Sequence, residues 1–227
     1  MYATKLFDQF NETLDSLGIY ANEGRIVDAS FVEVPRQRNT REENKQIKSG
    51  ETPKEWKEKP NKLAQKDVDA RWTQKNGVNF YGYKNHIKSD QKTKLIKKYV
   101  VTDASVHDSQ PLEALLDEND EGQKLHADSA YTGAKQEDVI SKNGMNNQVH
   151  EKGYRGKPLS EQQNKDNTEK SRIRARVEHI FGFVENSMHG SFVRTIGILR
   201  AKAKIGMMNL VYNIFRCIQL KKDVIMG

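Results

Sequence analysis

The stretch KLHADSAYTGAK, residues 124–135, ends a short apolar run on a carboxylate and follows it with small residues, an aromatic residue and a glycine. Residues 124–127 read as a short strand, and the segment around Gly133 reads as a turn that opens a helix. Asp128 therefore stands where a strand runs out into a loop. Open α/β sheets place their ligand sites outside the carboxyl ends of their strands, so this pattern predicts an α/β fold with Asp128 at its functional edge.

The rest of the chain predicts a mixed sheet with helices. Strands are expected over residues 25–34, 78–90, 93–105, 124–127 and about 145–150. Helices are expected over residues 5–17, 108–119, 133–143, about 170–188 and about 203–219, with a polar linker over 152–169. The three early strands favour antiparallel pairing, and the later alternation of strand and helix favours parallel additions.

Residues 35–77 interrupt this order after the first strand. They contain three prolines, many charges and almost no aliphatic residues, so we expect an extended, partly disordered basic insertion without a core of its own. The chain then divides into an N-terminal helical segment, residues 1–24, a catalytic domain with this insertion, residues 25–219, and a C-terminal tail, residues 220–227.

The charge of the chain is unevenly distributed. Its net charge is +7, with residues 35–77 at +5, residues 152–204 at +7 and the remainder acidic. Two basic segments around an acidic centre suggest a polyanion held over carboxylates, although either segment alone is equally well explained as solvated surface.

Other classes of protein are excluded by simple features. No apolar stretch is long enough for a membrane helix, and the N-terminus lacks the pattern of a signal peptide, so we expect a cytoplasmic protein without a membrane partner. Cys217 is the single cysteine, which excludes a disulfide framework, and we expect it to be buried and inert.

Three acids have a reason to lie inside the fold. Asp28 interrupts the apolar strand IVDASFV, Asp128 ends another strand, and Glu178 lies beside the apolar stripe of SRIRARVEHIFGFVENSM. Burying such charges is costly unless they are compensated, and acids from separate elements repel one another. A divalent cation would neutralise them, and ligands that are all oxygen point to Mg²⁺ or Mn²⁺.

Several neighbouring residues allow two interpretations. Arg174 shares the helix face of Glu178 and, with Arg172 and Arg176, forms a basic ridge that can bind phosphate, but Arg174 and Glu178 also suit an ordinary intrahelical ion pair. His126 is expected to face the same side of its strand as Asp128, with packing as its favoured role.

The remaining candidates have plain structural explanations. Asp103 also ends a strand and is the strongest competitor of Asp128, whereas His107 and Asp108 are expected to cap the following helix. Trp56 and Trp72 could stack on bases, but are more often expected to pin a loop.

Five phrases occur in the order IVDASFVEVPRQ, DVDARWTQKNGVNFYGYKNH, VVTDASVHDSQPLEALL, HADSAYTGAK and RIRARVEHIFGFVENSM. Together they resemble the DDE-type transposases of bacterial insertion sequences, from about residue 7 to residue 215. The resemblance implies an RNase H-like fold and assigns Asp28, Asp128 and Glu178 as the catalytic triad that holds two Mg²⁺ or Mn²⁺ ions. It also places Arg174 in the family's tyrosine–arginine–glutamate–lysine signature, in which this chain has Ser171 for the tyrosine and Glu185 for the lysine.

The resemblance further implies metal-dependent cleavage and strand transfer of double-stranded DNA, at element ends and target, by a nucleoid-associated enzyme. Relatives of this type usually carry an N-terminal helical region before the first catalytic strand, so we expect that region to be lost or separately encoded, and a homodimer is a further possibility. Two alternatives stay open: a nuclease of the same fold that does not transpose, and a DNA-binding remnant without catalysis.

Overall fold

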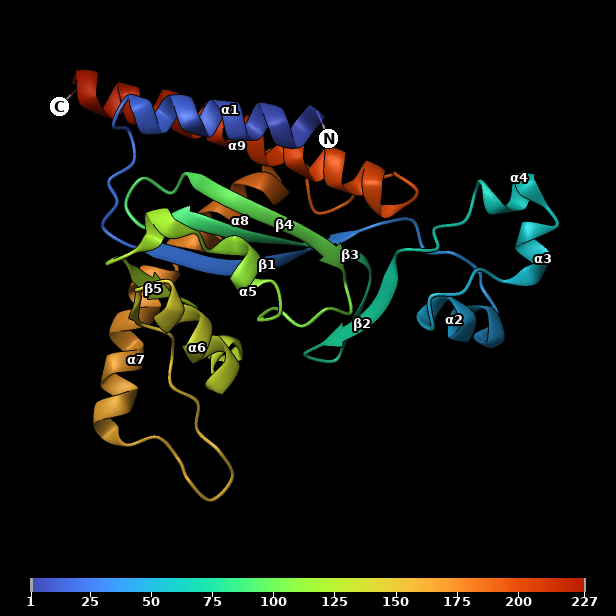
Figure 1. Cartoon of the computed structure of the whole chain (residues 1–227), viewed down its shortest axis with the longest axis horizontal. Coiled ribbons are helices and arrows are strands. Elements are labelled where there is room, and N and C mark those ends of the chain that lie inside the picture. The colour runs from blue at the N-terminus through green and yellow to red at the C-terminus, as the bar shows by residue number, and fades with distance from the viewer. Residues whose placement is uncertain (1, 227) are drawn as a thin grey trace.

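The computed structural model describes residues 2–226, with side chains described through Lys221. Its centre is a six-stranded mixed sheet in the order β2-β3-β1-β5-β6, with β4 also pairing with β3 (Figure 1). The strands are β1 Arg25–Glu33, β2 Arg71–Lys75, β3 Val78–Asp90, β4 Ile96–Asp103, β5 Lys124–His126 and β6 Asn146–Asn147. The expected α/β sheet flanked by helices is confirmed, and its arrangement is that of an RNase H-like fold.

The strand register determines which residues share a level of the sheet. β1 pairs antiparallel with β3 along its whole length, and it pairs parallel with β5 at Arg25↔Leu125 and Ile26↔His126. The same offset, continued two residues past Ile26, brings Asp28 level with Asp128. β2 and β4 pair with successive halves of the other edge of β3, so β2 lies at the end of the sheet remote from β5.

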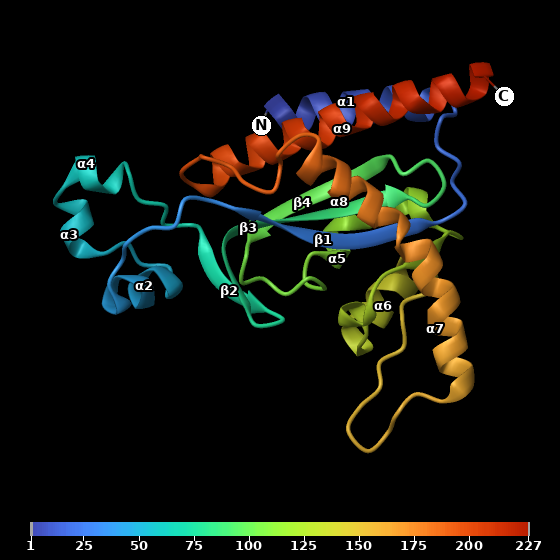
Figure 2. The ribbon, with the colours of Figure 1, turned by 180° about the vertical axis from the view of Figure 1, so that it is seen from behind.

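Helices cover both faces of the sheet. The helices are α1 Tyr2–Ser16, α2 Arg41–Lys48, α3 Lys54–Lys57, α4 Pro60–Leu63, α5 Leu112–Leu115, α6 Ala134–Lys142, α7 Glu161–Arg174, α8 Arg176–Asn186 and α9 Ile198–Met226. Apolar residues of α1, α8 and α9 pack on one face, and those of α5 and α6 pack on the other (Figures 1 and 2). Between residues 2 and 226, no helix combines the length and apolar character that crossing a bilayer requires.

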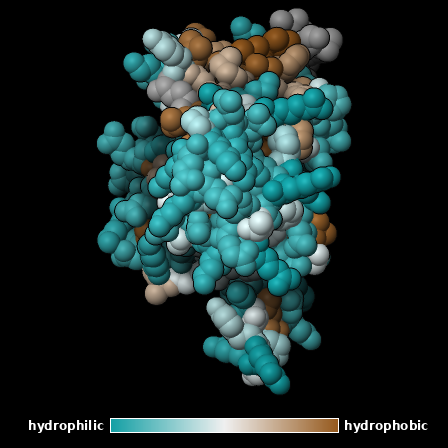
Figure 3. All heavy atoms as spheres, turned by 90° about the vertical axis from the view of Figure 1, so that its right-hand side faces the viewer, coloured by the Kyte–Doolittle hydropathy of each residue, from teal (hydrophilic) through white to brown (hydrophobic). Residues whose placement is uncertain are grey.

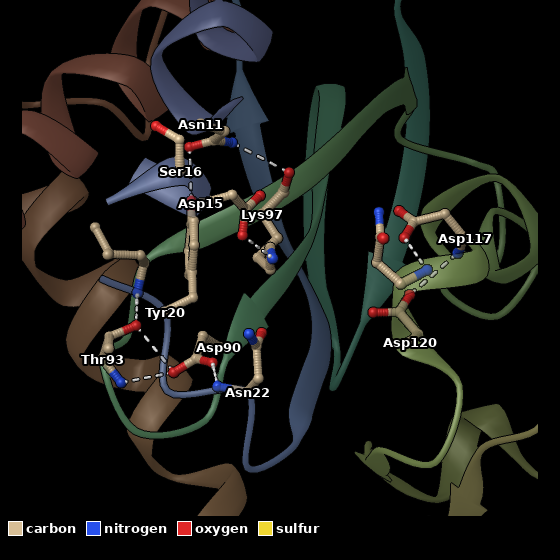
Figure 4. A network of polar contacts seen from close by, with 12 residues as sticks. Asn11, Asp15, Ser16, Tyr20, Asn22, Asp90, Thr93, Lys97, Asp117 and Asp120 are labelled. Carbon is tan, nitrogen blue, oxygen red and sulfur yellow. Dashed lines mark hydrogen bonds and ion pairs between the residues drawn. The ribbon is translucent and has the colours of Figure 1, made fainter. Parts of the chain in front are cut away.

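Buried charges hold the first residue of β1 in place. Arg25, fully buried, donates to Asp90 at 3.2 Å and to Asp120 at 2.8 Å, and Lys88 donates to the second oxygen of Asp120. Figure 4 shows Asp90 with its further partners Asn22 and Thr93, and Asp120 beside Asp117. Because each buried charge has an opposite partner, the network links β1 to β3 and to the turn before β5.

The insertion after β1 is folded, contrary to the prediction of partial disorder. Residues 36–70 form an arm of three short helices, α2, α3 and α4, which projects from the end of the sheet (Figure 1). Trp56 is 0% exposed, its Nε1 donates to Glu43 at 2.6 Å, and Lys66 lies 4.9 Å from the centre of its ring. The buried indole of Trp56 thus forms a small apolar core for the arm, which the scarcity of aliphatic residues had led us not to expect. In Figure 3 the arm faces the viewer, and its surface is almost entirely hydrophilic, whereas apolar residues show at the top of the view.

Other boundaries also differ from the predictions. The insertion ends in a strand, β2, and the predicted helix over 108–119 is reduced to α5 and a 3-10 turn at Glu118–Asp120. The predicted linker over 152–169 is shorter, because Ser160 caps α7 and starts it at Glu161. The predicted helix over 170–188 is divided at Ala175 between α7 and α8, α9 continues past residue 219 into the predicted tail, and Cys217 is half-buried rather than buried. Residue 227 of that tail lies outside the described residues.

Candidate active site

Asp28 is a buried carboxylate on the sheet face that α8 covers. Its side chain is 11% exposed, one oxygen accepts the N–H of Ala29 at 2.8 Å, and the other accepts Nη1 of Arg174 at 2.7 Å. Burial raises the pKa of Asp28 to about 6, against the lowering effects of the Ala29 N–H and of Arg174; the charges of Asp128 and Glu178 raise it further. Asp28 is therefore electrostatically coupled to both of the other predicted site acids.

Arg174 and Glu178 stand on either side of the break between α7 and α8. Nη2 of Arg174 lies 3.6 Å from Oε1 of Glu178, whose side chain is 61% exposed. The guanidinium, itself 25% exposed, thus contacts both Asp28 and Glu178. Two acids from distant parts of the sequence share one cation.

Asp128 follows β5, where the register brings it level with Asp28. It is half-buried and caps the 3-10 turn Ser129–Tyr131, with Oδ1 accepting the N–H of Ala130 at 2.8 Å. This capping role holds the carboxylate at the strand end and uses one of its two oxygens. The structure therefore places Asp128 level with Asp28 on the sheet, while Arg174 links Asp28 to Glu178; these three acids and Arg174 are called the acid cluster below.

The other two arginines of the predicted ridge do not reach the carboxylates. Arg172 is exposed, and Nη1 of Arg176 donates to the backbone carbonyl of Gln91 at 3.1 Å. Only Arg174 of the three joins the acid cluster, because it alone lies on the helix face turned toward β1.

Two residues of this region were missed by the sequence reasoning. His150 follows β6, its N–H donates to the carbonyl of Ala127, and its pKa is lowered by burial and by Arg174 while Asp128 acts to raise it. Tyr131 is buried, its hydroxyl has no hydrogen-bond partner among the described residues, and burial with the charges of Asp28 and Asp128 keeps its pKa well above the usual value. The presence of an aromatic residue three positions after Asp128 is the sequence signal that could have pointed to Tyr131.

The competing candidates lie elsewhere. Asp103 accepts the N–H of Ser105 and closes the turn after β4. Asp108 does not cap α5, whose N-cap is Pro111, but pairs with Lys84 at 2.7 Å.

His126 is 2% exposed, and neither of its ring nitrogens has a hydrogen-bond partner among the described residues. Burial lowers its pKa to about 4. This agrees with the packing role that the sequence favoured.

The acids suit a hard cation by their chemistry but are arranged around an arginine. Within residues 2–226, no group of three His, Cys, Asp or Glu side chains is gathered closely enough to hold a metal ion. The donors of Asp28, Asp128 and Glu178 are all carboxylate oxygens, the set that Mg²⁺ and Mn²⁺ prefer. The donor set thus fits such ions by its chemistry, and Arg174 occupies one of the two Asp28 oxygens.

Comparisons with known proteins identify the family of this chain. A family model described as the transposase DDE domain matches residues 20–214, which include all three acids. The chain is 26% identical over 219 residues to the transposase for insertion sequence element IS1106 of Neisseria meningitidis serogroup B. This match covers 94% of this chain and 72% of that relative. No solved structure matches. Because the family match spans most of the chain, this protein belongs to the DDE transposase family, whose members are enzymes that act on DNA.

Proposed function

We propose that this protein cuts and joins the DNA strands of an insertion sequence at a site formed by Asp28, Asp128 and Glu178. The observation that carries the proposal is the acid cluster around Arg174, in which a buried strand carboxylate and a helix carboxylate share one guanidinium. The parallel register of β1 and β5, which brings Asp128 level with Asp28, supports the inclusion of the third acid.

The three carboxylates would hold two Mg²⁺ or Mn²⁺ ions. Such ions activate an attacking water or 3′-hydroxyl and stabilise the leaving oxygen at phosphorus. The chain itself fixes the carboxylates: the Ala29 N–H orients Asp28, and the capping bond to the Ala130 N–H orients Asp128. Hydrolysis at an element end and transfer of that end to target DNA are both displacements at phosphorus, so one site serves both.

Arg174 would bind a phosphate oxygen of the DNA strand after it leaves Asp28. A guanidinium offers paired donors that match phosphate geometry, and its release frees the Asp28 oxygen for a cation. Arg172, which is exposed near the end of the same helix, would add a phosphate contact outside the site.

The test is a cleavage and strand-transfer assay with labelled element-end DNA and supercoiled target plasmid in Mg²⁺. We expect Asp28→Asn, Asp128→Asn and Glu178→Gln each to abolish both reactions while DNA binding is retained. Asp103→Asn is the matched control, because it removes a strand-end acid of similar sequence context that lies outside the cluster. Full activity of Asp128→Asn, or loss of activity only in Asp103→Asn, would overturn the assignment of the site.

The same assay separates the two alternatives. Cleavage without joined product would identify a nuclease of the same fold, and binding without either reaction would identify a catalytically silent remnant. We further propose that the active form acts on chromosomal DNA in the cytoplasm as a homodimer. Light scattering with and without DNA tests this assembly.

A further inference from the structure

A cavity of about 210 Å³ lies between the arm and the sheet, away from the acid cluster. Its lining residues come from α2, from the start of β2, from β3 and from the turn after β4: Asn44, Ile47, Lys48, Ala70, Arg71, Trp72, Tyr81 and Ser105. β2 is separated from β5, which leads to Asp128, by β3 and β1. The cavity is therefore distinct from the candidate active site.

The apolar part of the cavity is aromatic. Trp72 is 42% exposed and packs on Tyr81, with ring centres 5.0 Å apart. The other tryptophan, Trp56, is fully buried and pins the arm, so the two indoles have different roles. An exposed indole over a floor made by Ile47 and Tyr81 gives a planar ring system a surface on which to stack.

A planar cation already lies over this indole. The Arg36 guanidinium carbon is 5.6 Å from the centre of the Trp72 ring. The Arg36 side chain is 63% exposed, and its nearest acid, Glu33, is 3.6 Å away in an i,i+3 pair of the weak surface type. A flat ring that stacks on Trp72 can therefore displace the Arg36 guanidinium at little cost in free energy. Arg36 would then stay near the indole and balance a negative charge on the ligand.

The polar part of the cavity is positive. Lys48 and Arg71 line it, Asn44 and Ser105 supply neutral hydrogen-bonding groups, and none of its described lining residues is a carboxylate. Nη1 of Arg71 donates to the backbone carbonyls of Val68 at 2.7 Å and Ala70 at 3.1 Å, so Lys48 is the less occupied cation. Lys48 is exposed and makes no ion pair among the described residues. A ligand that suits this lining has a flat apolar ring and a negative charge close to it.

We propose that this cavity binds one unpaired nucleotide of a DNA strand, with its base stacked on Trp72 and its phosphate at Lys48. A base within a duplex is already stacked on its neighbours, so the site selects single-stranded or splayed DNA. The proposal needs DNA as the ligand but not the carboxylate site.

The experiment measures binding of the full chain to a single-stranded oligothymidylate and to a blunt duplex of equal length, in EDTA so that no cleavage occurs. Indole emission reports contact, since the chain has only two tryptophans and Trp56 is buried. We expect the single strand to quench emission, and Trp72→Phe to remove that quench.

Trp72→Ala should weaken single-strand binding by about tenfold and leave duplex binding unchanged. Lys48→Gln should reduce the slope of log K against log salt for the single strand by about 0.7. Tyr154→Ala is the matched control, because Tyr154 is an exposed aromatic residue with Lys152 6.0 Å from its ring, in a cavity that also contains two glutamates.

The proposal is overturned if Trp72→Ala leaves the single-strand affinity unchanged, if single strand and duplex lose affinity equally, or if Tyr154→Ala has the same effect. Thermal unfolding shows whether each variant is folded. If Trp72→Ala is not folded, the Lys48→Gln variant, which retains the indole, decides the question. Full single-strand affinity of Lys48→Gln, together with no quenching of Trp72 emission by the single strand, would refute the site. Failure here leaves the carboxylate assignment untouched, because that assignment is tested by cleavage in Mg²⁺.

Discussion

Arg174 is bonded more closely to Asp28, 146 residues away, than to Glu178 on the next helical turn. Its Nη1 lies 2.7 Å from Oδ2 of Asp28, and its Nη2 lies 3.6 Å from Oε1 of Glu178. One internal cation thus contacts two of the three carboxylates of the proposed catalytic site. Arginine and divalent ions compete for the same oxygens, and this competition can be measured.

Arg174→Ala should bind Mn²⁺ about tenfold more tightly than the native chain. A charge-assisted hydrogen bond contributes roughly 1.5–3 kcal/mol, and about 1.4 kcal/mol corresponds to a tenfold change in affinity. Calorimetric titration with Mn²⁺ measures the effect, and Arg172→Ala is the control because Arg172 is exposed and does not contact the acids. Weaker Mn²⁺ binding in Arg174→Ala would mean that the arginine positions the acids rather than competes for them.

Arg172 and Arg176 should differ in their effect on duplex binding. Each phosphate contact on duplex DNA contributes about 0.9 to the slope of log K against log salt. Arg172→Ala should flatten that slope by about this amount, whereas Arg176→Ala should change it less, because Arg176 donates to the Gln91 carbonyl. Gel-shift titrations at several salt concentrations decide the point, and equal slopes for the two variants would contradict it.

Trp56→Ala should unfold the arm locally while the sheet stays intact. Truncating a buried tryptophan costs roughly 3–5 kcal/mol, and the arm has few other buried apolar residues, among them Ile47. Limited trypsin digestion should become faster at the lysines and arginines of residues 36–66, with little change in the melting temperature of the whole chain. Trp72→Phe serves as the comparison, and equal digestion rates in both variants would show that Trp56 does not hold the arm.

Asp120→Asn should destabilise the fold by about 3–5 kcal/mol, because it leaves Arg25 and Lys88 buried with one counter-charge fewer. Glu23→Gln provides the matched case. The Glu23–Lys92 pair is just as close, at 2.6 Å, but its side chains are 53% and 62% exposed, so its loss should cost at most about 1 kcal/mol. Urea unfolding of both variants measures the difference, and similar losses would contradict a role for burial.

His86 should make the fold less stable below neutral pH. Burial lowers its pKa to about 4, and its Nε2 lies 2.9 Å from Thr102 Oγ1. At pH 7 the imidazole is neutral in the folded chain and mostly neutral in the unfolded chain. As the pH falls below about 6.5, the unfolded chain takes up a proton that the folded chain refuses, so stability declines.

The expected loss from His86 is on the order of 2 kcal/mol between pH 7 and pH 5. Urea midpoints of the native chain and of His86→Asn at the two pH values measure it. The urea midpoint of His86→Asn should fall less between pH 7 and pH 5 than that of the native chain. An equal fall in both would show that other groups cause the loss of stability.

Much of this protein could be predicted from the sequence because the signals are local. The long strand over 78–90 was predicted with its observed bounds, and the strand that contains Asp28 differs by one residue at its end. Two of the boundary errors also had a local signal, since Thr40 and Ser160 each begin a capping box that opens α2 and α7. The arm was misjudged because its centre is one tryptophan rather than a periodic run of aliphatic residues.

The partners of the site residues were decided only by the tertiary structure. Helical spacing allowed Arg174 a single local partner, Glu178, and the sequence offered no other. The closer partner is Asp28, because packing of α8 on β1 brings the end of α7 over a strand carboxylate that burial deprives of water. Spacing along a chain determines which side chains share a helix face or a strand level, but which charge meets which across elements depends on how those elements pack.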